Sequence, residues 1–309
     1  MKMQILLTGA SGAIGSQLGP QLAGEGHELR AFARDPKRVT AGCFDQIVRG
    51  DVLTGDGLGE ALEGIELAYY LIHSMEPSAA DEPFAERELR SAENFAAAAR
   101  RAGLRRVCYL GGLVPSDRPP SEHLASRLAV EEALLTSAPE ALSLRASIVI
   151  SAQSRSFRFL VRLLERSPLL PLPDWRDFRT QPIDGRDVVA YLKAAGLSAA
   201  VEGRLVLDIA GPDAVTYGQL IQRIAGAMLV SRPAVELPFS LTPIASVVAA
   251  SIAGEVSELV GPLMAGLSGD LLADDEAARE LFPIQLHRLD RAISHALREW
   301  EEKEPLAAR

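Results

Sequence analysis

The sequence has few cysteines, no excess of positive charge and no apolar leader at its start. Its two cysteines, Cys43 and Cys108, stand far apart without a CxxC pair, so we expect neither a disulfide framework nor a zinc site. The formal net charge of -9 would repel a phosphate backbone, so no nucleic-acid partner is expected. Because no charged region, long apolar run and cleavage site precede the first strand, a signal peptide is not expected, and the predicted location is cytoplasmic.

The sequence also lacks an uninterrupted apolar segment long enough for a membrane span. The Ala-rich stretch 241–267 comes nearest, but its uncharged run ends at Glu255 and Glu258, and Pro243 and Pro262 interrupt it. A span needs roughly 20 apolar residues. We therefore expect a buried or subunit-contact helix here.

Strand-like and helical patterns alternate through the first 150 residues. The expected strands are 3–8, 27–33, 45–50, 66–72, 105–111 and 142–147, and the expected helices are 13–25, 55–63, 84–102 and 122–137. Alternation of this kind, with right-handed crossovers, builds a parallel sheet covered by helices on both faces. The predicted fold class is α/β, with a doubly wound, Rossmann-type dinucleotide-binding domain over residues 1–150.

Residues 151–309 are predicted to form a smaller, mostly helical lobe that binds substrate, with a helical C-terminal extension. Helices are expected near 185–197, near 216–229 and after Arg288, with a strand at 204–210. Asp184 and Asp187 are interpreted as an ordinary helix start, with Asp184 as the N-cap. The proline-rich loop 167–175 is predicted to line an apolar pocket with Trp175, which favours a hydrophobic small-molecule substrate.

The segment TGASGAIG, residues 8–15, follows the first expected strand and opens the first expected helix. In this context Gly9 permits a tight turn, Gly12 lets the backbone approach a diphosphate, and Gly15 lets helix and strand pack closely. The helix N-terminus adds N–H groups and a positive dipole end. Cofactor contacts are therefore predicted along this turn, at Gly9, Ser11, Gly12, Ala13, Ile14 and Gly15.

With its Gly-x-x-Gly-x-x-Gly spacing the sequence resembles the short-chain dehydrogenase/reductase superfamily, in particular its extended and atypical members, which include NmrA-like NAD(P)-binding proteins. The segments GDVLTGDGLGEAL from Gly50, RTQPIDGRDVVAYL and AGPDAVTYGQLI extend the resemblance over most of residues 3–228. It implies that Asp51, with its neighbour Val52, meets the adenine. The last 80 residues or so match only loosely, as a helical appendage.

The end of the second strand bears on the choice between NAD and NADP. An acidic residue there would bind the ribose 2′-hydroxyl of NAD, whereas an arginine suits the 2′-phosphate of NADP. The sequence AFARDPKR places Arg34 at the strand end, with Lys37 and Arg38 beside it. We predict that Arg34 chelates the phosphate and that the cofactor is NADP; Asp35 keeps NAD as an alternative.

The resemblance implies a Tyr-x-x-x-Lys pair on the helix after the fifth strand, and a hydroxyl at that strand's end. This chain has His123 and Arg127 in place of the pair, and Gly111 and Gly112 in place of the hydroxyl. A histidine with an ordinary pKa of ~6.5 could act as the acid unaided, and arginine keeps the fixed charge that binds the nicotinamide ribose. The alternative is that both residues lie on the solvent-exposed face of a packed helix.

Histidines elsewhere carry weaker predictions. His73, next to Ile72, follows the fourth strand at the carboxyl edge of the sheet, where cofactor and substrate meet in open α/β folds. Ile72 and His73 are therefore predicted to contact the nicotinamide ribose, although a histidine satisfied by local hydrogen bonds is an equal alternative. The other histidines, at 27, 287 and 295, show no metal-ligand spacing, so no metal site is expected.

Two functions remain open from the sequence. The first is an oxidoreductase that transfers hydride between the nicotinamide and a carbonyl, hydroxyl or activated double bond of a small organic substrate. The second is a redox sensor or assembly factor of NmrA type that binds the dinucleotide without turning it over, which the missing catalytic groups favour. A sugar-nucleotide epimerase ranks last because it requires the Tyr-x-x-x-Lys pair. By analogy with the family, 121–137 would form a homodimer contact.

Overall fold

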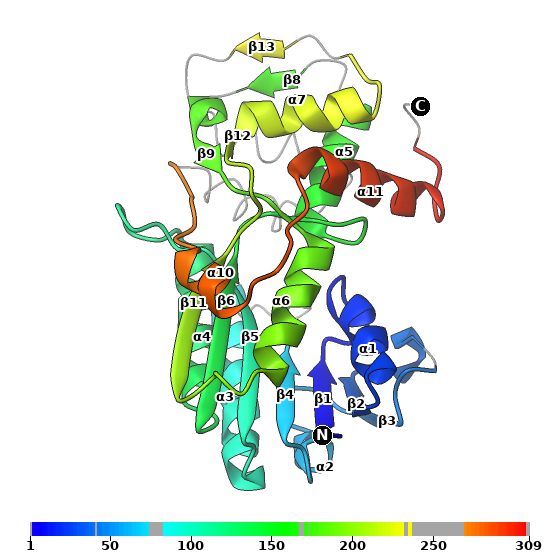
Figure 1. Ribbon diagram of the computed structural model, residues 1–309, viewed down its shortest axis with the longest axis vertical. Helices are drawn as coiled ribbons and strands as arrows, with labels where there is room; N and C mark the ends of the chain where they lie inside the picture. The colour runs from blue at the N-terminus through cyan, green and yellow to red at the C-terminus, as the bar shows by residue number, and fades with distance from the viewer. Residues whose placement is uncertain are drawn as a thin grey trace.

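A computed structural model describes residues 2–40, 42–73, 83–166, 170–172, 174–231, 234–236 and 269–306. Its centre is a sheet of seven parallel strands in the order β11-β6-β5-β4-β1-β2-β3 (Figure 1). These strands are β1 Gln4–Thr8, β2 Glu28–Ala33, β3 Gln46–Arg49, β4 Leu67–Tyr70, β5 Arg106–Gly112, β6 Glu140–Ala146 and β11 Arg204–Ile209. The strand order reverses between β1 and β4, and open α/β sheets bind ligands at the carboxyl edge of such a switch point.

Helices cover both faces of this sheet (Figure 1). One face is covered by α1 Gly15–Gly24, α6 Gly185–Leu197 and α10 Glu276–Leu281, and the other by α2 Leu58–Leu62, α3 Phe84–Ala102 and α4 Glu122–Leu135. The consequence is visible in β1, where Ile5, Leu6 and Leu7 are all fully buried although successive side chains point to opposite faces. A strand that is covered on both faces is apolar throughout, as β1 is. The helices that provide this cover come from the alternation of strands and helices along the chain.

A second hydrophobic core lies beyond the carboxyl edge of the sheet. Its helices are α5 Arg155–Arg166, α7 Tyr217–Ala227 and α11 Leu289–Glu301. Three two-stranded ribbons accompany them: β7 Val149–Ile150 with β10 Ile183–Asp184, β9 Arg179–Thr180 with β12 Val215–Thr216, and β8 Leu170–Leu172 with β13 Ala234–Glu236. The short 3-10 helices are η1 Pro36–Arg38 and η2 Asp174–Asp177. The indole of Trp300, 1% exposed, anchors this core, with the guanidinium of Arg158 4.2 Å from its centroid.

The predicted fold class is confirmed, and the structure adds two features. β11, which comes from the second half of the chain, pairs with β6 and completes the central sheet. The predicted domain boundary near residue 150 stays a prediction. The sequence did not predict α5, because the prolines of the following loop 167–175 indicated irregular structure in that region. Among the described residues, no helix combines the length and apolar composition needed to cross a membrane. The predicted helix at 241–267 lies outside the described residues.

Candidate functional site

The glycine turn has the geometry that the sequence predicts. Gly9 has a φ of +74°, and a Cβ there would lie 2.6 Å from the carbonyl oxygen of Leu71 on the neighbouring β4 segment. A Cβ on Gly15 would lie 2.3 Å from the Gly9 carbonyl oxygen, so helix α1 can begin here only without a side chain. Gly12 is exposed, and the nearest atom to a Cβ there is the Gly9 carbonyl oxygen at 3.1 Å. The open side of the turn thus leaves room for a ligand.

The first turn of α1 suits an anion. No side chain in the described part of the chain caps its N-terminus, and its first turn contains no acidic residue. Ser11 and Gly12 are exposed, Ala13 is half-buried, and Ile14 is buried against the core. Exposed N–H groups at the positive end of a helix bind phosphate groups. These residues therefore fit the diphosphate of a dinucleotide.

At the end of β2, Arg34 is exposed and Asp35 has a structural task. The Asp35 carboxylate accepts a hydrogen bond of 3.1 Å from the Lys37 backbone N–H and so caps η1. Arg34, Lys37 and Arg38 then supply three cations around this corner. This arrangement is compatible with a 2′-phosphate, and the contact of Arg34 with the cofactor stays a prediction.

After β3, Asp51 is held in a tight turn. Its Oδ1 atom accepts from the Leu53 backbone N–H at 2.8 Å, and its backbone pairs with Asp56. Asn94 on α3 donates to the carbonyl oxygens of Val52 and Leu53, at 3.1 and 2.9 Å. The segment predicted to meet the adenine is therefore rigid before any ligand binds, although the contact itself stays a prediction.

The structure brings His73, His123 and Arg127 together beyond the ends of β4 and β5. The Nη1 atom of Arg127 donates to Nδ1 of His73 and lies 3.6 Å from Oε1 of Glu88. Arg127 and Glu88 are only 5% and 4% exposed. Arg127 is therefore a buried charge and does not lie on the solvent-exposed face of α4.

Glu88 is the buried charge at this site that the sequence analysis missed. It lies on α3 among Ser91, Ala92 and Phe95 on the buried face of that helix, and its Oε2 atom is 3.5 Å from the Ser126 hydroxyl, which donates to it. A carboxylate at an apolar helical position signals a buried partner charge. The sequence contains this signal, because Glu88 shares a helix face with the apolar residues Ala92 and Phe95. The spacing alone does not identify Arg127 as the partner.

Both histidines favour the neutral state in this environment. Burial and then the Arg127 charge lower the pKa of His123 to about 4. The pKa of His73 is lowered well below its usual value, first by loss of solvation among the surrounding protein atoms, then by the charges of Arg127 and His123. Part of the His73 side chain is nevertheless exposed to solvent. The expectation that His123 titrates near neutrality is therefore wrong, because burial first, and then the Arg127 cation, disfavour the protonated ring. The ring of His123 stacks on Phe84, with centroids 6.2 Å apart.

No hydroxyl stands at the end of β5 in the position where the family resemblance expects one. Gly111 and Gly112 end the strand, and a Cβ on Gly111 would lie 3.0 Å from Cε1 of Tyr109. The Tyr109 hydroxyl is buried close to the Arg127 side chain. Burial raises its pKa to about 12, against the opposing charge of Arg127. Tyr109 is thus a buried, neutral phenol near Arg127.

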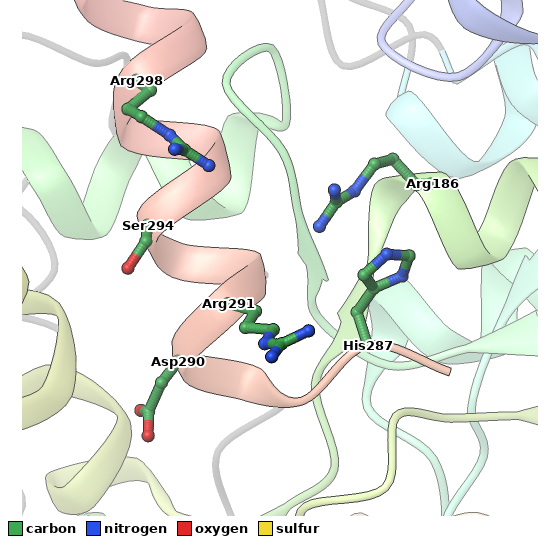
Figure 2. Close-up of a pocket in the computed structure, with 6 residues that line it drawn as sticks. All are labelled: Arg186, His287, Asp290, Arg291, Ser294 and Arg298. Atoms are coloured by element: carbon green, nitrogen blue, oxygen red, sulfur yellow. The ribbon is translucent and has the colours of Figure 1, made fainter. Parts of the chain in front are cut away.

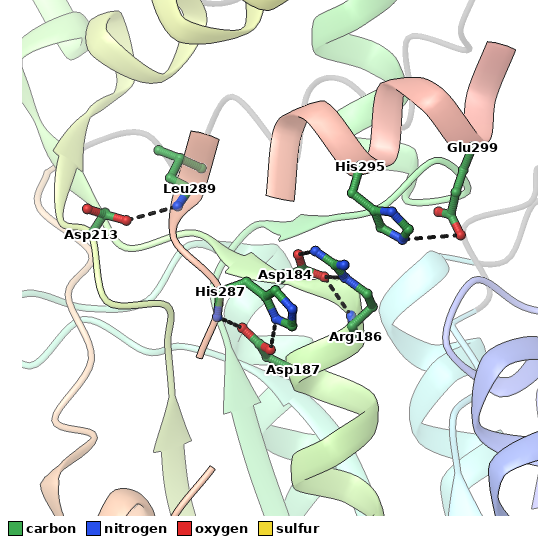
Figure 3. Close-up of polar contacts among 8 residues, drawn as sticks. All are labelled: Asp184, Arg186, Asp187, Asp213, His287, Leu289, His295 and Glu299. Atoms are coloured by element: carbon green, nitrogen blue, oxygen red, sulfur yellow. Dashed lines mark hydrogen bonds and ion pairs between the residues drawn. The ribbon is translucent and has the colours of Figure 1, made fainter. Parts of the chain in front are cut away.

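Asp184 and Asp187 lie where α6 begins, as Figure 3 shows. Asp184 caps the helix by accepting from the Arg186 backbone N–H at 2.8 Å, which confirms the predicted N-cap. Asp187 does more than the sequence indicated, because its carboxylate accepts from the backbone N–H of His287 at 2.8 Å and lies 2.6 Å from Nδ1 of the same residue (Figure 3). This buried carboxylate ties the segment before α11 to the first turn of α6.

Trp175 packs within the second lobe. Its ring meets Tyr217 edge-on, with centroids 6.2 Å apart, and it contacts the core formed by α5, α7 and α11. Its role in lining an apolar substrate pocket stays a prediction. Within the described ranges, no group of three or more histidine, cysteine, aspartate or glutamate side chains is placed to hold a metal ion.

Known proteins resemble this chain in both sequence and fold. Residues 9–147 match the family model described as NAD(P)H-binding. The chain is 28% identical over 218 residues to (4-alkanoyl-5-oxo-2,5-dihydrofuran-3-yl)methyl phosphate reductase from Streptomyces griseus subsp. griseus, an alignment that covers 69% of each protein. It is 26% identical over 263 residues to mitochondrial NADH dehydrogenase (ubiquinone) 1 alpha subcomplex subunit 9 from Arabidopsis thaliana, covering 82% of this chain and 64% of that subunit.

Among solved structures, a short-chain dehydrogenase/reductase superfamily protein from Agrobacterium tumefaciens with bound NAD superposes with a TM-score of 0.68. The match covers 97% of this chain and 99% of that one, at 18% identity. Sheet order, glycine turn and family match together define an NAD(P)-binding Rossmann protein. Residues 9–147 match the NAD(P)H-binding family model, and the chain has the fold of a short-chain dehydrogenase/reductase superfamily protein.

Proposed function

We propose that this protein is an NADP(H)-dependent oxidoreductase that transfers hydride to or from a small organic substrate. The observation that carries the proposal is the placement of His73 and His123, with the buried Arg127, beyond the carboxyl ends of β4 and β5. The glycine turn lies at the same edge of the sheet, after the adjacent strand β1. A nicotinamide cofactor supplies the hydride when bound, and the side chains around it orient the substrate.

The tautomer of His73 follows from its contact with Arg127. Arginine stays protonated and can only donate, so Nδ1 of His73 must accept. In a neutral imidazole the proton is then on Nε2, which becomes a donor. Arg127 acts as a positioning residue in this proposal, while its predicted contact with the nicotinamide ribose remains part of the same hypothesis.

A neutral imidazole N–H can stabilise the substrate oxygen that gains negative charge as hydride arrives. Neutral histidine is a suitable electrophile where a nearby positive charge or dipole keeps its pKa low. His123, with a pKa of about 4, would act together with His73 in this way. The reaction needs no tyrosine when the product is an enolate or alkoxide that takes its proton from solvent.

The reductase from Streptomyces griseus acts on the phosphate ester of an oxo-dihydrofuran, a small oxygenated ring compound. This relative supports a carbonyl or a carbonyl-conjugated double bond as the reacting group here. It leaves open whether the substrate of this chain is hydrophobic, as the sequence predicts from the 167–175 loop.

Turnover tests the chemistry directly. NADPH oxidation with a panel of ketones and conjugated enones should occur with the wild type, and His123→Ala should lower kcat by about 100-fold, the usual contribution of one positioned donor. Because His123 stays neutral above its pKa of about 4, kcat should not change as the pH falls through ~6.5. An inflection near that value that disappears in His123→Ala would show an ordinary titrating acid instead.

Arg34 tests the choice of cofactor without any substrate. Arg34→Ala should weaken NADPH binding by about tenfold or more while leaving NADH binding within a factor of two, because only NADPH carries the 2′-phosphate that the guanidinium would bind. Fluorescence titration of both reduced cofactors measures the effect. Arg101→Ala, at the exposed end of α3, removes the same charge elsewhere and should change neither affinity. Equal weakening for both cofactors would contradict the assignment.

The second candidate is a protein that binds the dinucleotide without turning it over. The glycines at the end of β5 and the likeness to the mitochondrial NADH dehydrogenase (ubiquinone) subunit of Arabidopsis thaliana favour it. It predicts NADPH binding with no oxidation on any member of the panel, and association with another protein that depends on the cofactor.

A further inference from the structure

An open cleft of about 610 Å³ lies between the first turn of α6 and the exposed side of α11 (Figure 2). Its lining is rich in cationic and hydrogen-bonding groups, namely Arg186, His287, Asp290, Arg291, Ser294 and Arg298. Three arginines and a histidine around one cleft stand out in a chain whose net charge is -9. None of these residues belongs to the glycine turn or to the group formed by His73, His123 and Arg127.

The carboxylates near this cleft already have partners. Asp184 holds Arg186 by two contacts of 3.0 and 2.5 Å, and Asp187 holds His287. Asp290, which also lines the cleft, pairs with Arg223 at 3.2 Å. Glu299 on α11 lies 3.6 Å from His295 (Figure 3). These pairings fix Arg186 and His287 in place before any ligand arrives.

Two cations in the cleft remain without a counter-charge. The guanidinium groups of Arg291 and Arg298 make no ion pair with any residue that the structure describes, and both side chains turn into the cleft in Figure 2. Ser294 lies between them, three residues after Arg291 and four before Arg298, so the three share one face of α11. Nδ1 of His287 faces the Asp187 carboxylate, which accepts from it, so this ring is already engaged on the α6 side of the cleft.

We propose that this cleft binds a phosphate group carried by a small molecule. Planar guanidinium forks match phosphate oxygens, and each fork can donate two parallel hydrogen bonds. The Ser294 hydroxyl adds a further donor, so the two guanidinium groups and this hydroxyl suit several acceptor oxygens. A bound phosphate would join α6, which packs on the Rossmann sheet, to α11 of the second lobe.

Calorimetric titration of inorganic pyrophosphate into the NADPH-saturated protein tests this site, since NADPH would keep the probe from the glycine turn. We expect binding to the wild type, about tenfold weaker binding for Arg291→Gln and for Arg298→Gln, and no measurable binding for the double variant. Both side chains are exposed, so the variants should melt like the wild type. Arg101→Gln is the matched control, because it removes one exposed charge outside the cleft.

NADPH affinity should be the same in all these proteins. If pyrophosphate binds the double variant as tightly as the wild type, or binds neither, the proposal is wrong. If the double variant loses NADPH and pyrophosphate together, the cleft is part of the cofactor site and is not a separate one. If the protein fails to bind NADPH at all, the pyrophosphate titration still compares wild type with variants, so the two proposals fail separately.

Discussion

Replacing Arg127 with methionine should lower the free energy of unfolding by about 3 kcal/mol, because the change removes the cation that faces a buried carboxylate. Methionine fills most of the space of the arginine stem, so loss of charge and hydrogen bonds, and not a cavity, causes the effect. The pKa of His73 should rise at the same time but stay below its usual value, because burial, the larger cause of its low pKa, remains when the Arg127 charge is removed. Chemical denaturation and NMR titration of the His73 ring measure the two effects.

A double variant separates the ion pair from general packing. Glu88→Gln with Arg127→Met removes both charges of a pair whose atoms lie 3.6 Å apart, so it should be more stable than Arg127→Met alone. Arg101→Met, at an exposed position, should change stability by less than about 0.5 kcal/mol. Equal losses for the single and double variants would show that Arg127 stabilises the fold without its charge.

Gly15→Ala should weaken NADPH binding by roughly 100-fold, because two backbone N–H groups contribute about 1.5 kcal/mol each to a bound anion. The new Cβ would lie 2.3 Å from the Gly9 carbonyl oxygen and 2.9 Å from Cα of Ala10, and neither backbone atom can move without opening the turn. Overpacking of this kind also costs about 1–3 kcal/mol of stability. Fluorescence titration and thermal melting give the two values.

Gly24 provides the matched control in the same helix. A Cβ there would meet nothing within 4 Å, so Gly24→Ala should bind NADPH as the wild type does. Its stability should be equal or slightly higher, because alanine favours helix over glycine. If Gly15→Ala binds NADPH normally in a folded protein, the turn does not hold the diphosphate.

The sequence predicted those parts of the site whose interacting residues lie close together along the chain. The glycine turn lies within eight residues, so the steric need for Gly9 and Gly15 was visible in their spacing. His123 and Arg127 were found as neighbours on one helix, yet the partners of Arg127 come from 54 and about 39 residues away in the chain, at His73 and Glu88. Burial there lowered the pKa of His123, which no local pattern indicates.

The sequence by itself determined the layer order of this protein: apolar strands alternating with amphipathic helices can bury their surfaces in few arrangements, and a parallel Rossmann sheet is the one they form here. Tertiary structure alone decided which charges face one another. Coulomb interactions and desolvation depend on distance in space, so Asp187 meeting His287 and Arg291 facing Arg186 across a cleft follow from the packing of α11 against β7 and β10, beside the start of α6. Asp187 and His287 lie 100 positions apart in the chain and meet only because the segment before α11 reaches the first turn of α6.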